Sequence, residues 1–175
     1  MQKNEQEDAY VRLARRTIEE YIHTGRLIDI PEGLPEEMYT GKAGVFVSIK
    51  KKGNLRGCIG TIRATCQSIA EEIVCNAVSA STKDPRFSPI GAGELEDLTI
   101  SVDVLGDMEE IDSPDQLDVK RYGVVVTKGY RRGLLLPNLE GVDTVEDQIA
   151  IAKQKAGIGF MEDVRLERFE VVRHF

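Results

Sequence analysis

Residues 44–60 read GVFVSIKKKGNLRGCIG, and this stretch decides the fold. Its first part, Gly44–Lys50, alternates apolar and other side chains with a period of two, which predicts a β-strand. Gly53 within Lys51–Asn54 predicts a turn, and Leu55–Ile62 then predicts the returning strand of a hairpin. The stretch therefore predicts an antiparallel hairpin, and the rest of the chain is interpreted around it.

Two amphipathic helices are predicted on either side of the hairpin. Asp8–Tyr21 places apolar side chains at a three-and-four spacing, and Gly25 is a suitable stop. Leu27–Lys42 contains several glycine and proline breaks and is predicted to be a loop. The second helix, Ser68–Ala80, begins with a capping box that Ser68 forms with Glu71. Its buried stripe is predicted to be Ile69, Ile73, Ala77 and Ala80.

The second half of the chain repeats this order. After a loop at 84–89 and a strand at 98–105, the pattern predicts strands at 123–128 and 134–137, a capped helix at 144–156 and a strand at 164–175. The motif K-G-x-x-R-G occurs at Lys52 and again at Lys128, and Ser68 falls on Thr144 at the same offset. We therefore expect one α+β domain, 1–175, built by duplication of hairpin–helix–strand units (44–105 and 123–175) into mainly antiparallel sheet.

Composition and charge narrow the possible functions. The chain has 175 residues, of which 41% are hydrophobic and 30% charged, so it is long enough to bury a core without disulfides. Its net charge of −7 disfavours nucleic-acid binding. We expect no membrane segment and, because three cysteines without a secretory signal indicate a reducing compartment, a cytoplasmic location. Two basic clusters, Lys50–Lys52 with Arg56 and Lys128 with Arg131–Arg132, suit one small anionic ligand.

The strand that begins at Leu55 carries the chemistry candidates. Alternation places Arg56 and Cys58 on one face, where a cation lowers the pKa of a thiol and favours the thiolate. Gly57 and Gly60 leave backbone bare beside the sulfur, and glycine in a strand marks a bulge or a closely approaching ligand. Cys58 is thus a candidate nucleophile with Arg56 as its support. The proposed binding surface consists of Leu55, Gly57, Ile59, Gly60 and the repeat-related Arg132.

Each of these residues also has a structural interpretation. A cysteine is more often a packing residue than a nucleophile, and a nucleophile needs a base, for which the chain offers only His23 and His174. Cys66 precedes a helix, where the helix dipole favours a thiolate. Cys75 lies within that helix and is predicted to pack. Further candidates with structural interpretations are Asp103, expected to be solvated, and the 84–87 segment (DPRF), expected to be a rigid turn and alternatively a lining of the site.

Several of these segments together resemble a known family. The runs LRGCIG (55–60), DPRF (84–87), GLLLP (133–137) and EGVDT (140–144) are similar to those of the AMMECR domain, whose prokaryotic members are called AmmeMemoRadiSam system protein A. The resemblance covers nearly the whole chain. It implies an α+β fold with two unequal lobes and, through genetic linkage, partnership with a Memo-like protein and a radical-SAM protein. It implies no established activity.

Three functional hypotheses follow. The first is a binding or accessory module that accepts a small anionic group or a peptide at Leu55–Gly60 and works beside partner proteins. The second is an enzyme that uses Cys58 as its nucleophile, and the third is a structural scaffold. The spacing of Cys, His and carboxylates predicts no metal site, and no cofactor is expected.

Overall fold

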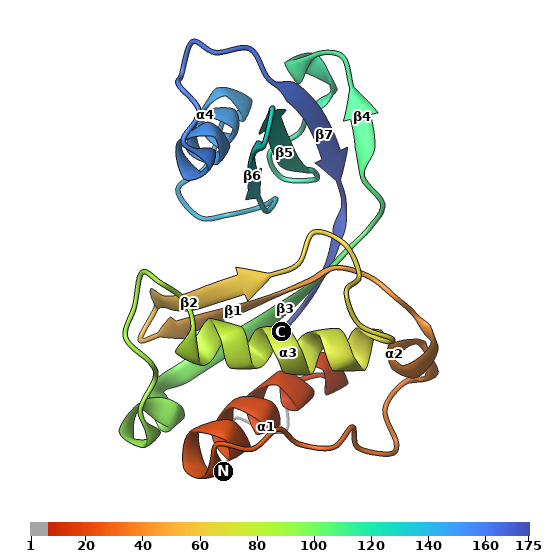
Figure 1. Cartoon of the computed structure of the whole chain (residues 1–175), viewed down its shortest axis with the longest axis vertical. Coiled ribbons are helices and arrows are strands. Elements are labelled where there is room, and N and C mark those ends of the chain that lie inside the picture. The colour runs from red at the N-terminus through yellow and green to blue at the C-terminus, as the bar shows by residue number, and fades with distance from the viewer. Residues whose placement is uncertain (1–6) are drawn as a thin grey trace. The chain divides into compact units, whose positions relative to one another are not determined.

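The computed structural model describes residues 7–175, which divide into two compact units (Figure 1). Unit 1 holds the described residues up to Leu105 together with Val172–Phe175, and unit 2 holds Gly106–Val171. Each unit has its own four-stranded sheet and its own hydrophobic core. The chain is therefore an α+β protein with antiparallel sheets and helices packed on them.

Unit 1 is a sheet covered on one face by helices. Its elements are α1 (Ala9–Thr24), α2 (Glu36–Thr40), β1 (Val45–Lys51), β2 (Asn54–Gly60), α3 (Ile69–Thr82), a 3-10 turn (Ala92–Asp97), β3 (Leu98–Leu105) and β8 (Val171–His174). The strand order is β2-β1-β3-β8, so β2 is an edge strand. Helix α3 packs on β1 and β2, and α1 packs on α3 and β3. Val45, Val47 and Ile49 point into this core and are fully buried.

Unit 2 is smaller and also consists of a sheet with a helix packed on it. Its elements are β4 (Glu109–Ile111), a 3-10 turn (Pro114–Gln116), β5 (Gly123–Lys128), β6 (Arg131–Leu135), α4 (Val145–Ala156) and β7 (Arg165–Phe169), with strand order β4-β7-β5-β6. Helix α4 packs on β5 and β6. The predicted caps are confirmed in both units, because Ser68 accepts a hydrogen bond from the Glu71 N–H and Thr144 accepts one from the Asp147 N–H.

Three sequence predictions about the elements need correction. The segment 27–42 is not entirely loop, since it contains the short helix α2. The returning strand β6 begins at Arg131 and not at Leu134, because the second hairpin turns tightly at Gly129–Tyr130. The predicted strand 164–175 is divided at Glu170 into β7 and β8, which belong to different sheets. The duplication itself stays a prediction.

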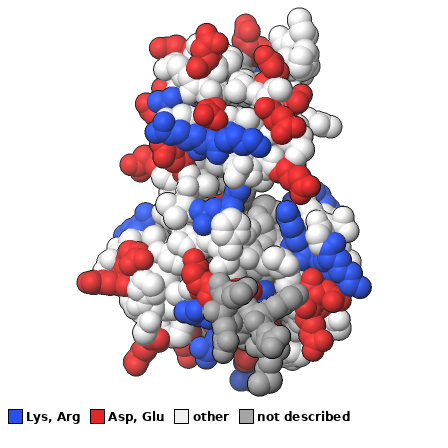
Figure 2. All heavy atoms as spheres, turned by 180° about the vertical axis from the view of Figure 1, so that it is seen from behind, with Lys and Arg blue, Asp and Glu red and all other residues white. Residues whose placement is uncertain are grey.

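Charged side chains of both signs are interspersed on the face of each unit that Figure 2 displays. The two basic clusters that the sequence offered to an anionic ligand are each offset by carboxylates. In unit 1, Lys51 and Arg56 pair with Glu94. In unit 2, Lys128 and Arg131 share Glu162. No helix among residues 7–175 is long and apolar enough to cross a bilayer.

Candidate functional site

A β-bulge interrupts β2 in the middle of the candidate motif. Ile49 of β1 pairs with Gly57, whereas the next residue, Lys50, pairs with Leu55, so that Arg56 is an additional residue on the β2 side. A bulge re-aims the side chain at which it occurs and breaks the strict alternation of faces. Alternation alone therefore does not place Arg56 beside Cys58, and the direction of its guanidinium follows from its contacts.

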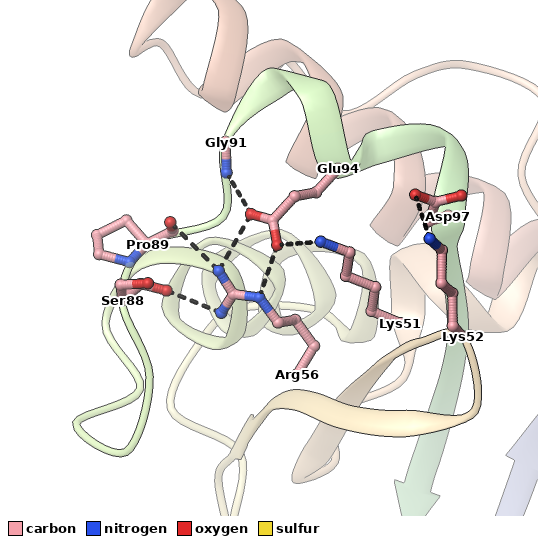
Figure 3. Close-up of polar contacts among 8 residues, drawn as sticks. All are labelled: Lys51, Lys52, Arg56, Ser88, Pro89, Gly91, Glu94 and Asp97. Carbon is pink, nitrogen blue, oxygen red and sulfur yellow. Dashed lines mark hydrogen bonds and ion pairs between the residues drawn. The ribbon is translucent and has the colours of Figure 1, made fainter.

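The guanidinium of Arg56 is directed to Glu94 and to the loop before it (Figure 3). Its Nε and Nη2 donate to the two Glu94 carboxylate oxygens at 3.0 and 3.1 Å, and Nη1 donates to the Ser88 carbonyl at 2.8 Å. Lys51 Nζ and the Gly91 N–H donate to the same carboxylate at 3.0 and 2.8 Å. Arg56 thus ties the hairpin to the segment 88–94.

This network also decides the electrostatics around Arg56. The hydrogen bond from Arg56, followed by those from Gly91 and Lys51, lowers the pKa of Glu94 to about 2, so Glu94 is ionised at neutral pH. Two cations therefore share one carboxylate. Glu94 thus compensates the charge of Arg56, and the support that Arg56 was expected to give to a Cys58 thiolate stays a prediction.

Cys58 is held by a different pair of residues. Its N–H donates to Asp84 Oδ2 at 3.0 Å, and its carbonyl accepts from Arg86 Nη2 at 3.3 Å. Because β2 is an edge strand, these backbone groups face away from β1, and the side chains of the 84–87 segment satisfy them. The Cys58 sulfur lies 3.2 Å from Ser48 Oγ, its cross-strand neighbour on β1. The segment therefore lines the candidate site, which was the alternative to a plain turn.

The Asp84–Arg86 ion pair holds the backbone of Cys58 on both sides. Asp84 is buried and receives two hydrogen bonds from the Arg86 guanidinium, at 3.0 and 2.8 Å. The hydrogen bond from Arg86 is the main reason that the pKa of Asp84 falls to about 2. The pKa of Arg86 is raised, chiefly by Asp84 and to a lesser degree by the charge of Cys58. Arg86 is therefore the cation on which a charge at Cys58 acts, although Asp84 already compensates it. Asp84 is too weak a base to accept the thiol proton.

Cys58 and Ser48 lie on what we call the outer sheet face, the side of the unit 1 sheet opposite the helices. By the strand register it comprises Phe46, Ser48, Cys58, Ser101 and Asp103. Asp103 was expected to be solvated, but only 2% of its side chain is exposed because Arg173 of β8 binds it at 2.7 and 3.0 Å. The face therefore combines an aromatic ring, two hydroxyls, a thiol and a neutralised ion pair.

The glycines of the motif are close-packing positions and not openings for a ligand. A Cβ atom on Gly57 would lie 2.1 Å from the Ala80 carbonyl oxygen of α3, and one on Gly60 would lie 2.2 Å from the ring of Phe46. Ile59 packs against the unit 1 core, and Leu55 is exposed. Phe46 therefore fills the space at Gly60, and α3 fills the space at Gly57 on the opposite face of the sheet.

The remaining candidates lie in other contacts. Arg132 belongs to unit 2, where its Nη2 donates to Glu167 at 3.4 Å. His174 stacks on Tyr10, with 3.7 Å between ring centroids, and its Nδ1 contacts Asp8. These contacts commit Arg132 to its own sheet and His174 to the start of α1.

Sequence reasoning missed a cavity in unit 1. It has a volume of about 540 Å³ and is lined by Ile30, Pro31, Glu32, Gly33, Tyr39, Gln67, Ser68 and Glu71. The Tyr39 hydroxyl donates to the Pro31 carbonyl and accepts from the Leu34 N–H, which fixes the loop over α2. No motif marks these residues, and the only local signal was the dense glycine and proline content of the segment.

Comparison with known proteins assigns this α+β chain to one protein family. The AMMECR1 family profile matches residues 11–174. A protein of Thermotoga maritima is 49% identical over 170 residues, which cover 96% of this chain and 98% of that protein. A protein of Clostridium acetobutylicum is 53% identical over 98% of this chain, but the chain spans only 37% of that relative's length.

A solved structure agrees with the fold. The crystal structure of an uncharacterised protein from Pyrococcus horikoshii superposes with a TM-score of 0.86 at 35% sequence identity, covering 94% of this chain and 88% of that one. The chain belongs to the AMMECR1 family. The resemblance noted from the LRGCIG strand is therefore confirmed.

Proposed function

We propose that this protein is a binding or accessory module whose contact surface is the outer sheet face, and that it works beside partner proteins. One observation carries the proposal. The same module forms nearly the whole of the Thermotoga relative, yet it is a minor part of the much longer Clostridium relative. A module that occurs both alone and joined to further polypeptide is typical of a unit that acts together with another protein.

The chemistry of the outer sheet face favours a polypeptide partner over a small anion. Arg56, Arg86 and Arg173 each form an ion pair with a carboxylate of their own unit. A small anion would have to displace those carboxylates at a cost in desolvated charge. Hydroxyls, a thiol and an aromatic ring instead suit the mixed polar and apolar contacts of a protein interface. The partners implied by the family are a Memo-like protein and a radical-SAM protein.

Calorimetric titration against each of these two proteins, purified from the same organism, tests the proposal. Ser48→Lys adds a charged chain beside Cys58 and is expected to weaken binding about tenfold or more, because it obstructs the centre of the face and buries a charge. Tyr130→Lys is the matched control. It introduces the same charged side chain in unit 2, at a residue that is 95% exposed. Absence of binding to both proteins, or equal affinities of the two variants, would refute the proposed surface.

A second candidate function rests on the position of Arg86. We propose that this guanidinium supports a Cys58 thiolate, because a charge at Cys58 acts on Arg86 and a cysteine nucleophile requires such support. The reaction would need a base from the substrate or a partner, since the pKa of Asp84, at about 2, is too low for it to accept the thiol proton. The enzyme hypothesis therefore changes its supporting residue from Arg56 to Arg86.

The rate of Cys58 alkylation by iodoacetamide as a function of pH tests this second candidate. Arg86→Gln is expected to slow alkylation near neutral pH, because it withdraws the cation from the reacting thiolate, whereas Arg56→Gln is expected to leave the rate close to that of the wild type. Peptide mapping separates Cys58 from Cys66 and Cys75. Equal slowing by both variants would count against a specific role for Arg86.

A further inference from the structure

The two cysteines outside the candidate site form a pair. Cys66 Sγ and Cys75 Sγ lie 3.8 Å apart, the first in the loop between β2 and α3 and the second on α3. Cys75 is exposed and Cys66 is half-buried, so the prediction that Cys75 is a packing residue is wrong. A disulfide bond requires about 2 Å between the sulfurs, so the two sulfur atoms must approach each other by a further distance of about 2 Å.

A buried carboxylate fixes the loop that carries Cys66. Glu72 of α3 is only 1% exposed and accepts hydrogen bonds from the Cys66 N–H at 2.9 Å and from the Thr65 hydroxyl at 2.7 Å. The Thr61 hydroxyl, at 3.0 Å, and the Thr65 N–H also donate to this carboxylate. Burial alone would raise the pKa of Glu72, but these hydrogen bonds together lower it, so the carboxylate is ionised. The hydrogen bonds of Glu72 thus hold the loop with Cys66 next to Cys75, so the contact of the two side chains is a consequence of the fold.

We propose that Cys66 and Cys75 are a redox modification site that closes reversibly into an intramolecular disulfide, with hydrogen peroxide as the oxidant. The Cys66 thiolate attacks one peroxide oxygen, the O–O bond breaks, and the departing hydroxide takes a proton to become water. The Cys75 sulfur then attacks the resulting sulfenic acid at sulfur. An S–S bond forms, and the hydroxyl leaves with the Cys75 proton as a second water molecule, so that two thiols are oxidised and one peroxide is reduced.

The environments of the two thiols assign these roles. Although Cys75 is exposed as a residue, partial desolvation of its sulfur, the hydrogen bond with Cys66 and the nearby carboxylate of Glu72 raise the pKa of Cys75 to about 11. Cys75 is therefore protonated at neutral pH and is a poor first nucleophile. The first attack falls to Cys66, and the resolving step by Cys75 is expected to accelerate as the pH rises toward the pKa of Cys75.

The site adjoins the cavity of unit 1. Gln67 and Ser68, which follow Cys66 directly, line the cavity, and so does Glu71 from the first turn of α3. A bond from Cys66 to α3 would add a covalent tie to the hydrogen bonds of Glu72. Oxidation would therefore stiffen one wall of this cavity without touching the outer sheet face.

Mass spectrometry of the purified protein after mild peroxide treatment tests the proposal. We expect the intact mass to fall by two hydrogen atoms, a linked peptide pair containing Cys66 and Cys75, and full reversal by dithiothreitol. Cys58→Ser is the matched control and is expected to form the same link. In Cys75→Ser, the Cys66 sulfenic acid has no resolving partner and is expected to be captured by dimedone.

Two outcomes would overturn the proposal. One is oxidation of Cys66 and Cys75 to separate acids without a linked peptide. The other is a link that involves Cys58 or a second copy of the chain in place of the Cys66–Cys75 pair. The fold of each variant is checked by circular dichroism before oxidation, and the wild-type link alone decides the question should a variant fail to fold.

Discussion

At the scale of single residues, Gly57 shows why the LRGCIG strand requires a glycine at this position. The Ala80 carbonyl of α3 occupies the space that a side chain at position 57 would need. In unit 2, the Ala152 carbonyl of α4 approaches Gly133 in the same way, so both hairpins meet their helices at a glycine. These glycines set how closely each helix lies on its strands.

Gly57→Ala is therefore expected to destabilise the protein by about 3 kcal/mol, because either α3 or β2 must move away. Gly93→Ala is the control, since a Cβ atom there meets nothing within 4 Å. Urea denaturation of both variants measures the effect. A change at Gly57 no larger than that at Gly93 would show that α3 can shift freely.

The Asp84–Arg86 pair predicts loss of stability in acid. The pKa of Asp84 is lowered from 3.8 to about 2 in the folded chain. Its ionised form thus stabilises the fold by about 2 kcal/mol above pH 4, and this contribution disappears as the pH falls from about 4 to 2. Asp84→Asn should be less stable at pH 7 and lose less stability on acidification. Parallel curves for wild type and variant would exclude this role.

The residues around Cys58 also mark the limit of sequence-based prediction. Cys58 itself stood out through its glycine-flanked strand, but its cation was expected to be Arg56. The bulge between Ile49 and Lys50 breaks the two-residue period, and the glycine signal could not show on which residue the bulge would fall. Arg86 approaches Cys58 from a loop that is distant in sequence, and no local pattern encodes such a contact.

At the scale of the elements, periodicity and capping predicted the helices well. All four residues of the stripe predicted for α3 are buried, and its Ser68 cap is confirmed. The side chains of α4 that face its sheet are only partly buried, since Ala152 is inaccessible but Ile149 is half-buried. Helix α3 is also covered by α1 and α2, whereas α4 packs on β5 and β6. Local sequence contains no information about which further elements will cover a helix.

This difference between the helices gives a prediction. Ile73→Ala is expected to cost about 4 kcal/mol, because Ile73 is fully buried and the substitution leaves a cavity. Ile149→Ala should cost about half as much, since part of its side chain already contacts water. Chemical denaturation compares the two. Equal losses would mean that unit 2 buries Ile149 more completely than its exposure indicates.

At the scale of the whole molecule, the net charge is −7, and cations and carboxylates are interspersed on the face that Figure 2 displays. The pairing of Arg56 with Glu94 and of Arg131 with Glu162 leaves neither basic cluster as an uncompensated patch. The net charge had predicted weak nucleic-acid binding, whereas the two clusters had been interpreted as sites for a small anion. The individual pairs could not be predicted, because they join segments that only the fold brings together.

We therefore expect no submicromolar binding to duplex DNA near physiological salt, since phosphate binding needs unpaired cations that release counterions. A fluorescence anisotropy titration with a labelled duplex measures it. Tight binding that weakens steeply with added salt would contradict the charge pairing described above.

The division of the C-terminal segment between β7 and β8 has a consequence for how the protein is made. Unit 2 is contiguous in sequence, whereas unit 1 is completed only when Val172–Phe175 has been synthesised. Until then β3 lacks its neighbour β8, and Asp103 lacks Arg173, its partner in the ion pair. Unit 1 therefore begins first, yet its sheet is completed by β8, which is synthesised after all of unit 2. The nascent chain must carry an open sheet edge with an uncompensated carboxylate, and that charge helps to keep the waiting edge from pairing with other chains.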